Sequence, residues 1–180
     1  MKRLITFIAA IFIFLGFAFF QSNTKQTAKP KIPTVGLLQL MNQPALAQIQ
    51  KGVIAGLKDE GYVKGKTVKI DYQNAQGNQS NLKSMSEKFE NENADLMIGI
   101  TTPSSLALAD VTKKTPIVLG AVTDPKGAGL VKNENHPEAN ITGVSDQAPL
   151  KEQLGLIRKL MPKLKTLGII YTSSDNSAVA

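Results

Sequence analysis

The sequence has no cysteine and no tryptophan, and it holds a single histidine among 180 residues. The absence of cysteine excludes disulfide bonds, thiolate metal sites, cysteine nucleophiles and lipid attachment through cysteine. A single histidine leaves no cluster of imidazole ligands and no ready partner for a serine nucleophile. We therefore expect no metal, no cofactor and no catalytic residues, so that the chain is not an enzyme. Its length suits one ordinary domain.

Most of the excess positive charge lies at the start of the chain. The formal net charge is +7, but the first 31 residues hold five basic and no acidic side chains. The other 149 residues hold 16 basic and 14 acidic ones, so this part is nearly neutral. Proteins that bind nucleic acid carry a basic face or stripe, which is missing here. We expect no nucleic-acid partner.

The N-terminus has the order of a secretory signal. Lys2 and Arg3 precede residues 4–20, of which 15 of 17 are apolar, and a polar stretch follows. A buried core helix is the alternative, but the run has no polar face to meet solvent. The apolar run ends in Ala18-Phe19-Phe20, and the bulky phenylalanines disfavour cleavage of the signal. As a helix the run would be about 25 Å long, which is at the short end of a membrane span. We expect export to the extracellular face, anchored in the membrane through residues 4–20 or secreted, with 21–32 as a flexible tether.

Short apolar strands alternate with amphipathic helices from residue 33 onward. The expected strands are 34–40, 68–72, 94–100, 116–119, 141–144 and 166–171, and the expected helices are 44–61, 79–91, 103–111 and 150–160. Such alternation is typical of crossover units, in which a parallel sheet is covered by helices on both faces. The predicted fold class is α/β, with a doubly wound parallel sheet.

The last helix and strand do not complete a domain. Residues 150–171 add one helix and one strand, and the chain stops nine residues later. They form either a sixth strand of the same sheet or the start of a second lobe, which one strand cannot close. We favour the second interpretation. It makes residues 33–146 a nearly complete first lobe and residues 147–180 the beginning of a second, so that the chain is a fragment.

Polar residues follow each expected strand, where open parallel sheets bind ligands. In the TTPSS segment, Thr102 is a candidate N-cap, and Ser104 brings a hydroxyl beside unpaired backbone N–H groups, which suits an anion. Plain helix capping explains this segment equally well. Asp124, before a proline, is typical of a turn. Opposite an anion site, however, its carboxylate would complement the ammonium group of a zwitterion. Asp146 is either a ligand contact or a cap for the following helix.

The order of these segments resembles a known family. VGLLQL, IDYQNAQGNQSNL, IGITTPSSLALA, PIVLGAVTDPKGAGLV, NITGVSDQ and GIIYTSSDNS together resemble the substrate-binding proteins of ABC importers, specifically the tryptophan/tyrosine type. The resemblance runs from about Thr34 to Asn176. Two departures stand out: many relatives carry a lipobox cysteine, which is missing here, and relatives continue well past Ala180.

The resemblance implies a function and a set of contacts. It implies a type 1 periplasmic-binding-protein-like fold whose two lobes close on a small-molecule ligand, an aromatic amino acid, together with permease and ATPase partners. The ligand-binding residues that we expect are Gln39, Thr102, Ser104, Asp124, Asp146, Ser174 and Asn176. With most of the second lobe absent, the ligand would keep only two or three polar contacts in water, so we expect weak binding. An anchored sensor domain of the same fold is the main alternative, and a small α/β enzyme is the other.

Overall fold

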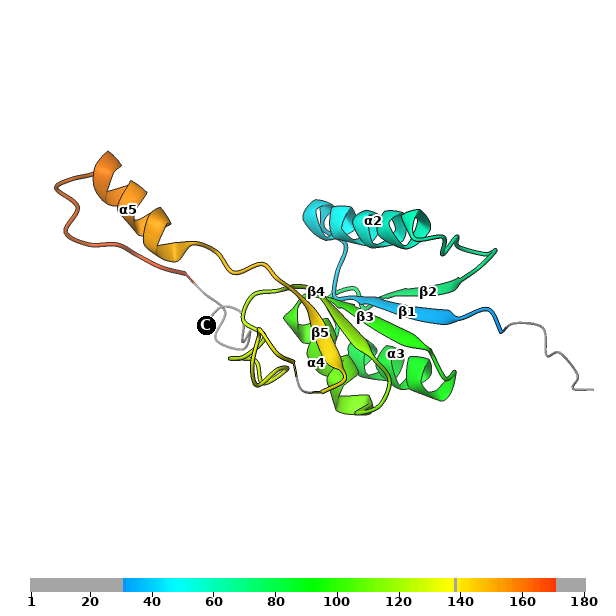
Figure 1. Cartoon of the computed structure of the whole chain (residues 1–180). Helices are drawn as coiled ribbons and strands as arrows, with labels where there is room; N and C mark the ends of the chain where they lie inside the picture. Colours follow the sequence, from blue (N-terminus) through cyan, green and yellow to red (C-terminus); the bar gives the residue numbers. More distant parts are fainter. Residues whose placement is uncertain (1–30, 138, 171–180) are drawn as a thin grey trace, which may run out of the picture. The chain divides into compact units, whose positions relative to one another are not determined.

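A five-stranded parallel sheet forms the centre of the fold. The computed structural model describes residues 31–137 and 139–170. The strands are β1 (Thr34–Gln39), β2 (Lys69–Asn74), β3 (Leu96–Ile100), β4 (Ile117–Val122) and β5 (Ile141–Ser145), and the helices are α2 (Pro44–Asp59), α3 (Gln79–Asn91), α4 (Thr102–Val111) and α5 (Leu150–Leu160). The strand order is β2-β1-β3-β4-β5, and every neighbouring pair is parallel (Figure 1). The predicted doubly wound α/β class is confirmed.

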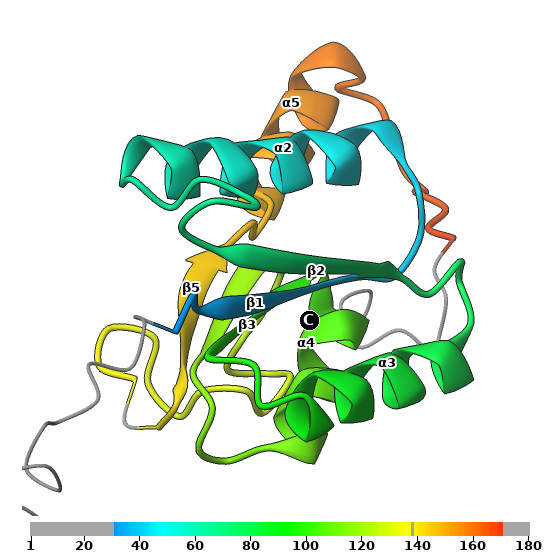
Figure 2. The ribbon, with the colours of Figure 1, turned by 90° about the vertical axis from the view of Figure 1, so that its right-hand side faces the viewer.

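Helices cover the two faces of the sheet because the apolar side chains of the strands alternate between them. On one face, Leu37 belongs to the core beneath α2, whose Leu46, Ile49, Val53, Ile54 and Leu57 pack against it. On the other face, Leu38 belongs to the core that includes Leu82 and Phe89 of α3 and Leu108 of α4. Figure 2 shows α2 on one side of the sheet and α3 and α4 on the other.

The predicted elements agree with the structure except at the C-terminal end. Each predicted helix is present, with boundaries within two residues of those expected. The predicted strand 166–171 is wrong over its described part, because residues 164–170 form no regular structure and are exposed. Position 171 lies outside the described residues. A strand exists only when it pairs with another, and the described residues offer this segment no such pairing.

The C-terminal helix α5 buries none of its residues. The exposed apolar side chains of α5 and the following segment are Leu150, Leu154, Leu156, Leu160, Met161, Leu164, Leu167, Ile169 and Ile170. The division into a first lobe (33–146) and the start of a second (147–180) stays a prediction. Among the helices that the structure describes, none is long and apolar enough to cross a membrane. The predicted signal or anchor (4–20) lies outside the described residues, as does nearly all of the tether.

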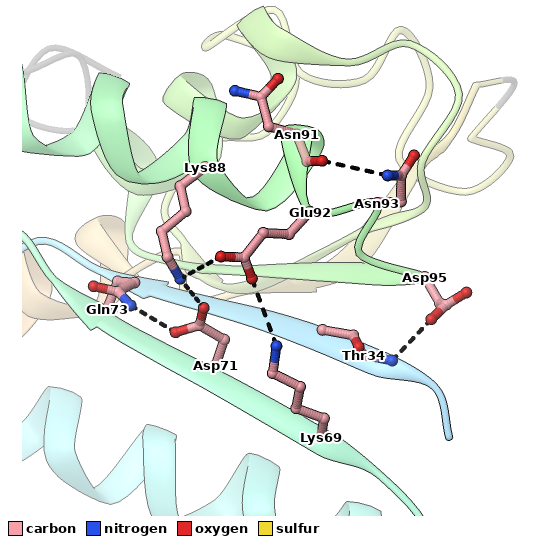
Figure 3. A network of polar contacts seen from close by, with 9 residues as sticks. All are labelled: Thr34, Lys69, Asp71, Gln73, Lys88, Asn91, Glu92, Asn93 and Asp95. Atoms are coloured by element: carbon pink, nitrogen blue, oxygen red, sulfur yellow. Dashed lines mark hydrogen bonds and ion pairs between the residues drawn. The ribbon is translucent and has the colours of Figure 1, made fainter. Parts of the chain in front are cut away.

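An ion-pair network joins α3 to the edge strand β2 (Figure 3). Lys88 donates a hydrogen bond to one carboxylate oxygen of Asp71, and Gln73 Nε2 donates to the other at 2.6 Å. Glu92 lies 3.3 Å from Lys88 and 3.6 Å from Lys69, so it bridges the two ammonium groups. Partial burial opposes ionisation of Asp71, but the hydrogen bonds from Lys88 and Gln73 outweigh it and lower the pKa of its carboxyl. The bond to Asp71 is likewise the main cause that raises the pKa of Lys88.

The lowered pKa of Asp71 predicts a loss of stability in acid. A carboxyl whose pKa falls on folding stabilises the folded state above its unfolded pKa, and this contribution disappears as the pH drops through the folded pKa. We expect Asp71→Asn to lower the free energy of unfolding by about 1 kcal/mol at pH 7, a modest value because Lys88 is partly solvated. The difference should vanish near pH 2 in urea titrations. The exposed Lys83–Glu87 pair provides the control, because Glu87→Gln should show almost no such dependence. A deficit of Asp71→Asn that persists unchanged at pH 2 would contradict this explanation.

Candidate functional site

The carboxyl ends of all five strands meet at one edge of the sheet. The register pairs Gln39 with Asn74 on one side and with Ile100 on the other. It continues by pairing Ile100 with Gly120, and Val122 with Ser145. Neighbouring strands lie about 4.8 Å apart, so the loops that follow them are close together. The predicted site residues that the structure describes, Gln39, Thr102, Ser104, Asp124 and Asp146, all follow or end strands at this edge.

The chain changes direction between β1 and β3, which are neighbouring strands of the sheet. After β1 the chain passes through α2 to β2, whereas after β3 it passes through α4 to β4, on the opposite side of β1. The two helices cover opposite faces of the sheet, so the loop 40–43 and the residue Thr101 diverge from adjacent strand ends. Open α/β sheets bind their ligands beyond the strand ends at such a switch point, so we expect the binding crevice here.

The helix α4 begins in a strained conformation. Thr101 is the N-cap residue, and its φ of 85° and ψ of 161° fall in a region that is nearly exclusive to glycine. Such a backbone costs on the order of 1–3 kcal/mol and is found at ligand sites more often than elsewhere. The prediction that Thr102 is the cap is wrong by one residue, because Thr102 already lies within the helix and no side-chain cap bond forms. The backbone N–H groups of the first turn of α4 therefore have no capping side chain to accept their hydrogen bonds.

Two hydroxyl groups at this helix start have no hydrogen-bond partner among the described residues. They are Thr101 Oγ1 and Ser104 Oγ, and the Ser104 residue is completely buried. The neighbouring Ser105 is satisfied, because its hydroxyl donates to the carbonyls of Thr101 at 2.9 Å and Gly99 at 3.2 Å. A buried hydroxyl without a partner costs roughly 1–3 kcal/mol. The start of α4 thus has free polar groups suited to an acceptor such as a carboxylate oxygen.

Asp124 forms the turn that its sequence context predicts. Its Oδ1 accepts a hydrogen bond of 2.7 Å from the backbone N–H of Gly127, and the side chain is half-buried. The second carboxylate oxygen has no protein partner among the described residues, so the group can hold the loop and still accept a further hydrogen bond. Turn formation and ligand binding are therefore compatible roles for this residue.

The remaining predicted residues differ in their surroundings. Gln39 is fully buried, and both ends of its amide are bonded within the protein. Asp146 is exposed, and the interpretation of Asp146 as the cap of α5 is wrong, because Pro149 occupies that position and no side-chain cap bond forms. Ser174 and Asn176 lie outside the described residues.

Three features at this edge escaped the sequence analysis. Thr101, which directly follows β3, and Ala121, the residue before the last in β4, have positive φ angles of 85° and 61°, although neither is a glycine. No sequence pattern marks them, because strain of this kind depends on the surrounding fold. Tyr72 lies beside Gln39, and the sequence pattern could have indicated this. Alternate residues of a strand share one face of the sheet, and the pairing of Leu37 with Tyr72 puts Tyr72 on the same face as Gln39.

A groove of about 1020 Å³ runs between α3 and α4, and its lining includes Thr102, Pro103 and Asp110. Thr102 is the one predicted site residue that it contains. The other described candidate residues do not line this groove, and we place the candidate site at the switch point between β1 and β3. Among the described residues, no group of three acidic or histidine side chains is placed to hold a metal ion.

The family model of ABC transporter substrate-binding proteins matches residues 34–180. The chain belongs to this family. The matched range starts with β1 and includes every strand and helix that the structure describes. The resemblance to ABC substrate-binding proteins that the sequence showed is thereby confirmed at the level of the family.

Individual relatives agree with this family. The chain is 40% identical over 154 residues to a protein named "Tyrosine-binding protein" of Clostridioides difficile, covering 86% of this chain and 45% of the relative. An ABC domain from Streptococcus pneumonia, solved in complex with L-Trp, is 43% identical with a TM-score of 0.78, covering 82% of this chain and 50% of that one. A conserved domain protein of Vibrio cholerae is 40% identical with a TM-score of 0.80, covering 83% and 50%. The chain spans about half the length of these relatives, and their likeness confirms the periplasmic-binding-protein-like fold.

Proposed function

We propose that this chain supplies the first lobe of the ligand-binding subunit of an ABC importer, and that its ligand is an aromatic amino acid. The start of α4 carries the proposal, because it presents two unpartnered hydroxyl groups beside unpaired backbone N–H groups at the switch point. The names of two relatives, one tyrosine-binding and one bound to L-Trp, support the choice of ligand class.

Two charges of opposite sign on the ligand would be recognised by neighbouring loops. The carboxylate of the amino acid would accept hydrogen bonds at the start of α4, from Thr102 and Ser104 and the adjacent N–H groups. Its ammonium group would donate to the free carboxylate oxygen of Asp124, one strand away. Such charge-assisted hydrogen bonds are roughly twice as strong as neutral ones. Gln39 would lie beneath the ligand site, with Asp146 at its rim, while Ser174 and Asn176 would contact the ligand from the second lobe.

The proposed function also includes a location and a set of partners in the cell. We propose that the protein is exported and works on the outer side of the cytoplasmic membrane, held there by residues 4–20 or released. Its partners would be the permease and ATPase subunits of the importer. The protein would bind and release its ligand unchanged, so we propose no catalytic residue.

A panel of amino acids tests the ligand class. In ¹⁵N-resolved NMR titrations of the chain at millimolar ligand, L-tryptophan and L-tyrosine should shift the signals of residues 101–105 and 121–124. L-leucine and L-glutamate should shift them less at equal concentration, because they offer no aromatic ring. Equal responses to all four amino acids would contradict the aromatic assignment. Turnover of an ester or a phosphoester by the chain would contradict the binding role.

A further inference from the structure

A chain of polar side chains connects β2 to the loop that follows β1. Asn74 Nδ2 donates to the Tyr72 hydroxyl at 3.1 Å, and this hydroxyl donates to Gln39 Oε1 at 3.2 Å. Gln39 Nε2 then donates to the backbone carbonyl of Met41 at 2.6 Å. The chain therefore ends on the loop 40–43, which follows β1 at the switch point between β1 and β3.

Gln39 is the central member of this chain. Its side chain is completely buried, and both its acceptor and its donor are used by protein groups. A direct contact with ligand would require one of these bonds to break while the freed atom stayed buried, which is costly. Gln39 is therefore better suited to hold the loop 40–43 than to touch the ligand.

Other contacts also hold this loop, and the side chain of Leu40 packs against the core that includes Leu82 and Phe89. Leu40 accepts a backbone hydrogen bond of 2.8 Å from Gly77, which ties the loops after β1 and β2 together. Gln43, the N-cap residue of α2, forms no cap bond and instead contacts the sulfur of Met41 at 3.0 Å. Met41 thus receives contacts from both Gln39 and Gln43, and its position sets the course of the loop into α2.

We propose that Tyr72 is a positioning residue of the ligand site, acting through Gln39 on the loop 40–43. The inference rests on the proposed function, because it takes this crevice as the binding site. The Tyr72 ring packs against the core beneath α2, and only its hydroxyl enters the polar chain. Removing the hydroxyl leaves Gln39 Oε1 buried without a donor. The amide must then rotate or the loop must shift, and the crevice changes shape without any change in the residues that line it.

Tyr72→Phe tests this role, because phenylalanine keeps the ring and removes the hydroxyl. In NMR titrations of the full chain with L-tryptophan, the dissociation constant of this variant should be about fivefold higher than that of the wild type. The side-chain amide signals of Gln39 and the backbone signals of residues 41–43 should shift before any ligand is added. Tyr62→Phe is the matched control, because Tyr62 is 47% exposed, and its variant should bind as the wild type does.

A double-mutant cycle separates positioning from direct contact or general destabilisation. If Tyr72 acts through Gln39, then Tyr72→Phe combined with Gln39→Met should bind no more weakly than Gln39→Met alone. Additive losses would overturn the inference, as would an unchanged dissociation constant in Tyr72→Phe when the wild type binds. If L-tryptophan does not shift the NMR signals of residues 101–105 in the wild type, the proposed function is refuted instead. The inference about Tyr72 then loses its basis as well.

Discussion

Replacing Asp124 by asparagine is expected to weaken the binding of L-tryptophan at least about tenfold while the loop around it stays folded. The amide oxygen of asparagine can still accept the hydrogen bond from Gly127, so the turn is retained. The negative charge that would pair with the ligand's ammonium group is lost. A charged hydrogen bond is worth about 1.5–3 kcal/mol, which corresponds to a tenfold or larger change in affinity.

Two further variants make this prediction decisive. Asp124→Ala removes both the charge and the turn bond, so it should bind as weakly as Asp124→Asn and also lower the melting temperature. Asp110→Asn alters an exposed carboxylate in the last turns of α4, at the opposite end of this helix from the site, and should bind normally. Dissociation constants from NMR titrations provide the comparison. Wild-type affinity in Asp124→Asn would show that Asp124 is only a turn residue.

Replacing Gly99 by alanine is expected to destabilise the fold more than any other single methyl group added to the strands β3 and β4. A Cβ at Gly99 would lie 2.8 Å from the Cα and 2.9 Å from the backbone nitrogen of Ser105. These are backbone atoms in the first turn of α4, so the helix itself must move. Overpacking of this kind costs about 1–3 kcal/mol. The start of α4 would be displaced, and the proposed carboxylate contacts would be lost with it.

Gly120, one strand away, is the matched control for this substitution. A Cβ there would meet its nearest neighbours at 3.6–3.7 Å, which is ordinary van der Waals contact. Urea denaturation should show a clear loss of stability for Gly99→Ala and a change below about 1 kcal/mol for Gly120→Ala. Equal effects of the two variants would contradict the close packing of α4 on β3.

The fold was predictable from the sequence because its signals are local. The apolar residues of α2, from Leu46 to Leu57, recur at helical spacing, and all of the predicted ones pack on the core. The prediction of a strand at 166–171 was wrong because a strand does not depend on local signals alone. Its composition favours a strand, but a strand also needs a neighbour, and composition does not show whether one is present.

The candidate site was predictable in its location but less so in its details. The predicted strands placed Thr102, Ser104 and Asp124 at one edge of the sheet, and the structure places them there as well. The backbone strain of Thr101 could not be predicted, because it results from the way α4 is held against β3. The hydrogen bond that Gln39 accepts from Tyr72 was also not predictable, since the two residues lie 33 positions apart in the sequence.

The most direct test of the account removes one charge of the ligand at a time. Three compounds share the indole ring: L-tryptophan, tryptamine without the carboxylate, and indole-3-propionate without the ammonium group. L-tryptophan should bind most tightly in NMR titrations. Tryptamine should lose the shifts at residues 101–105, and indole-3-propionate should lose those near Asp124. Equal binding of all three compounds, or shifts confined to the groove between α3 and α4, would contradict recognition of a zwitterion at the crevice.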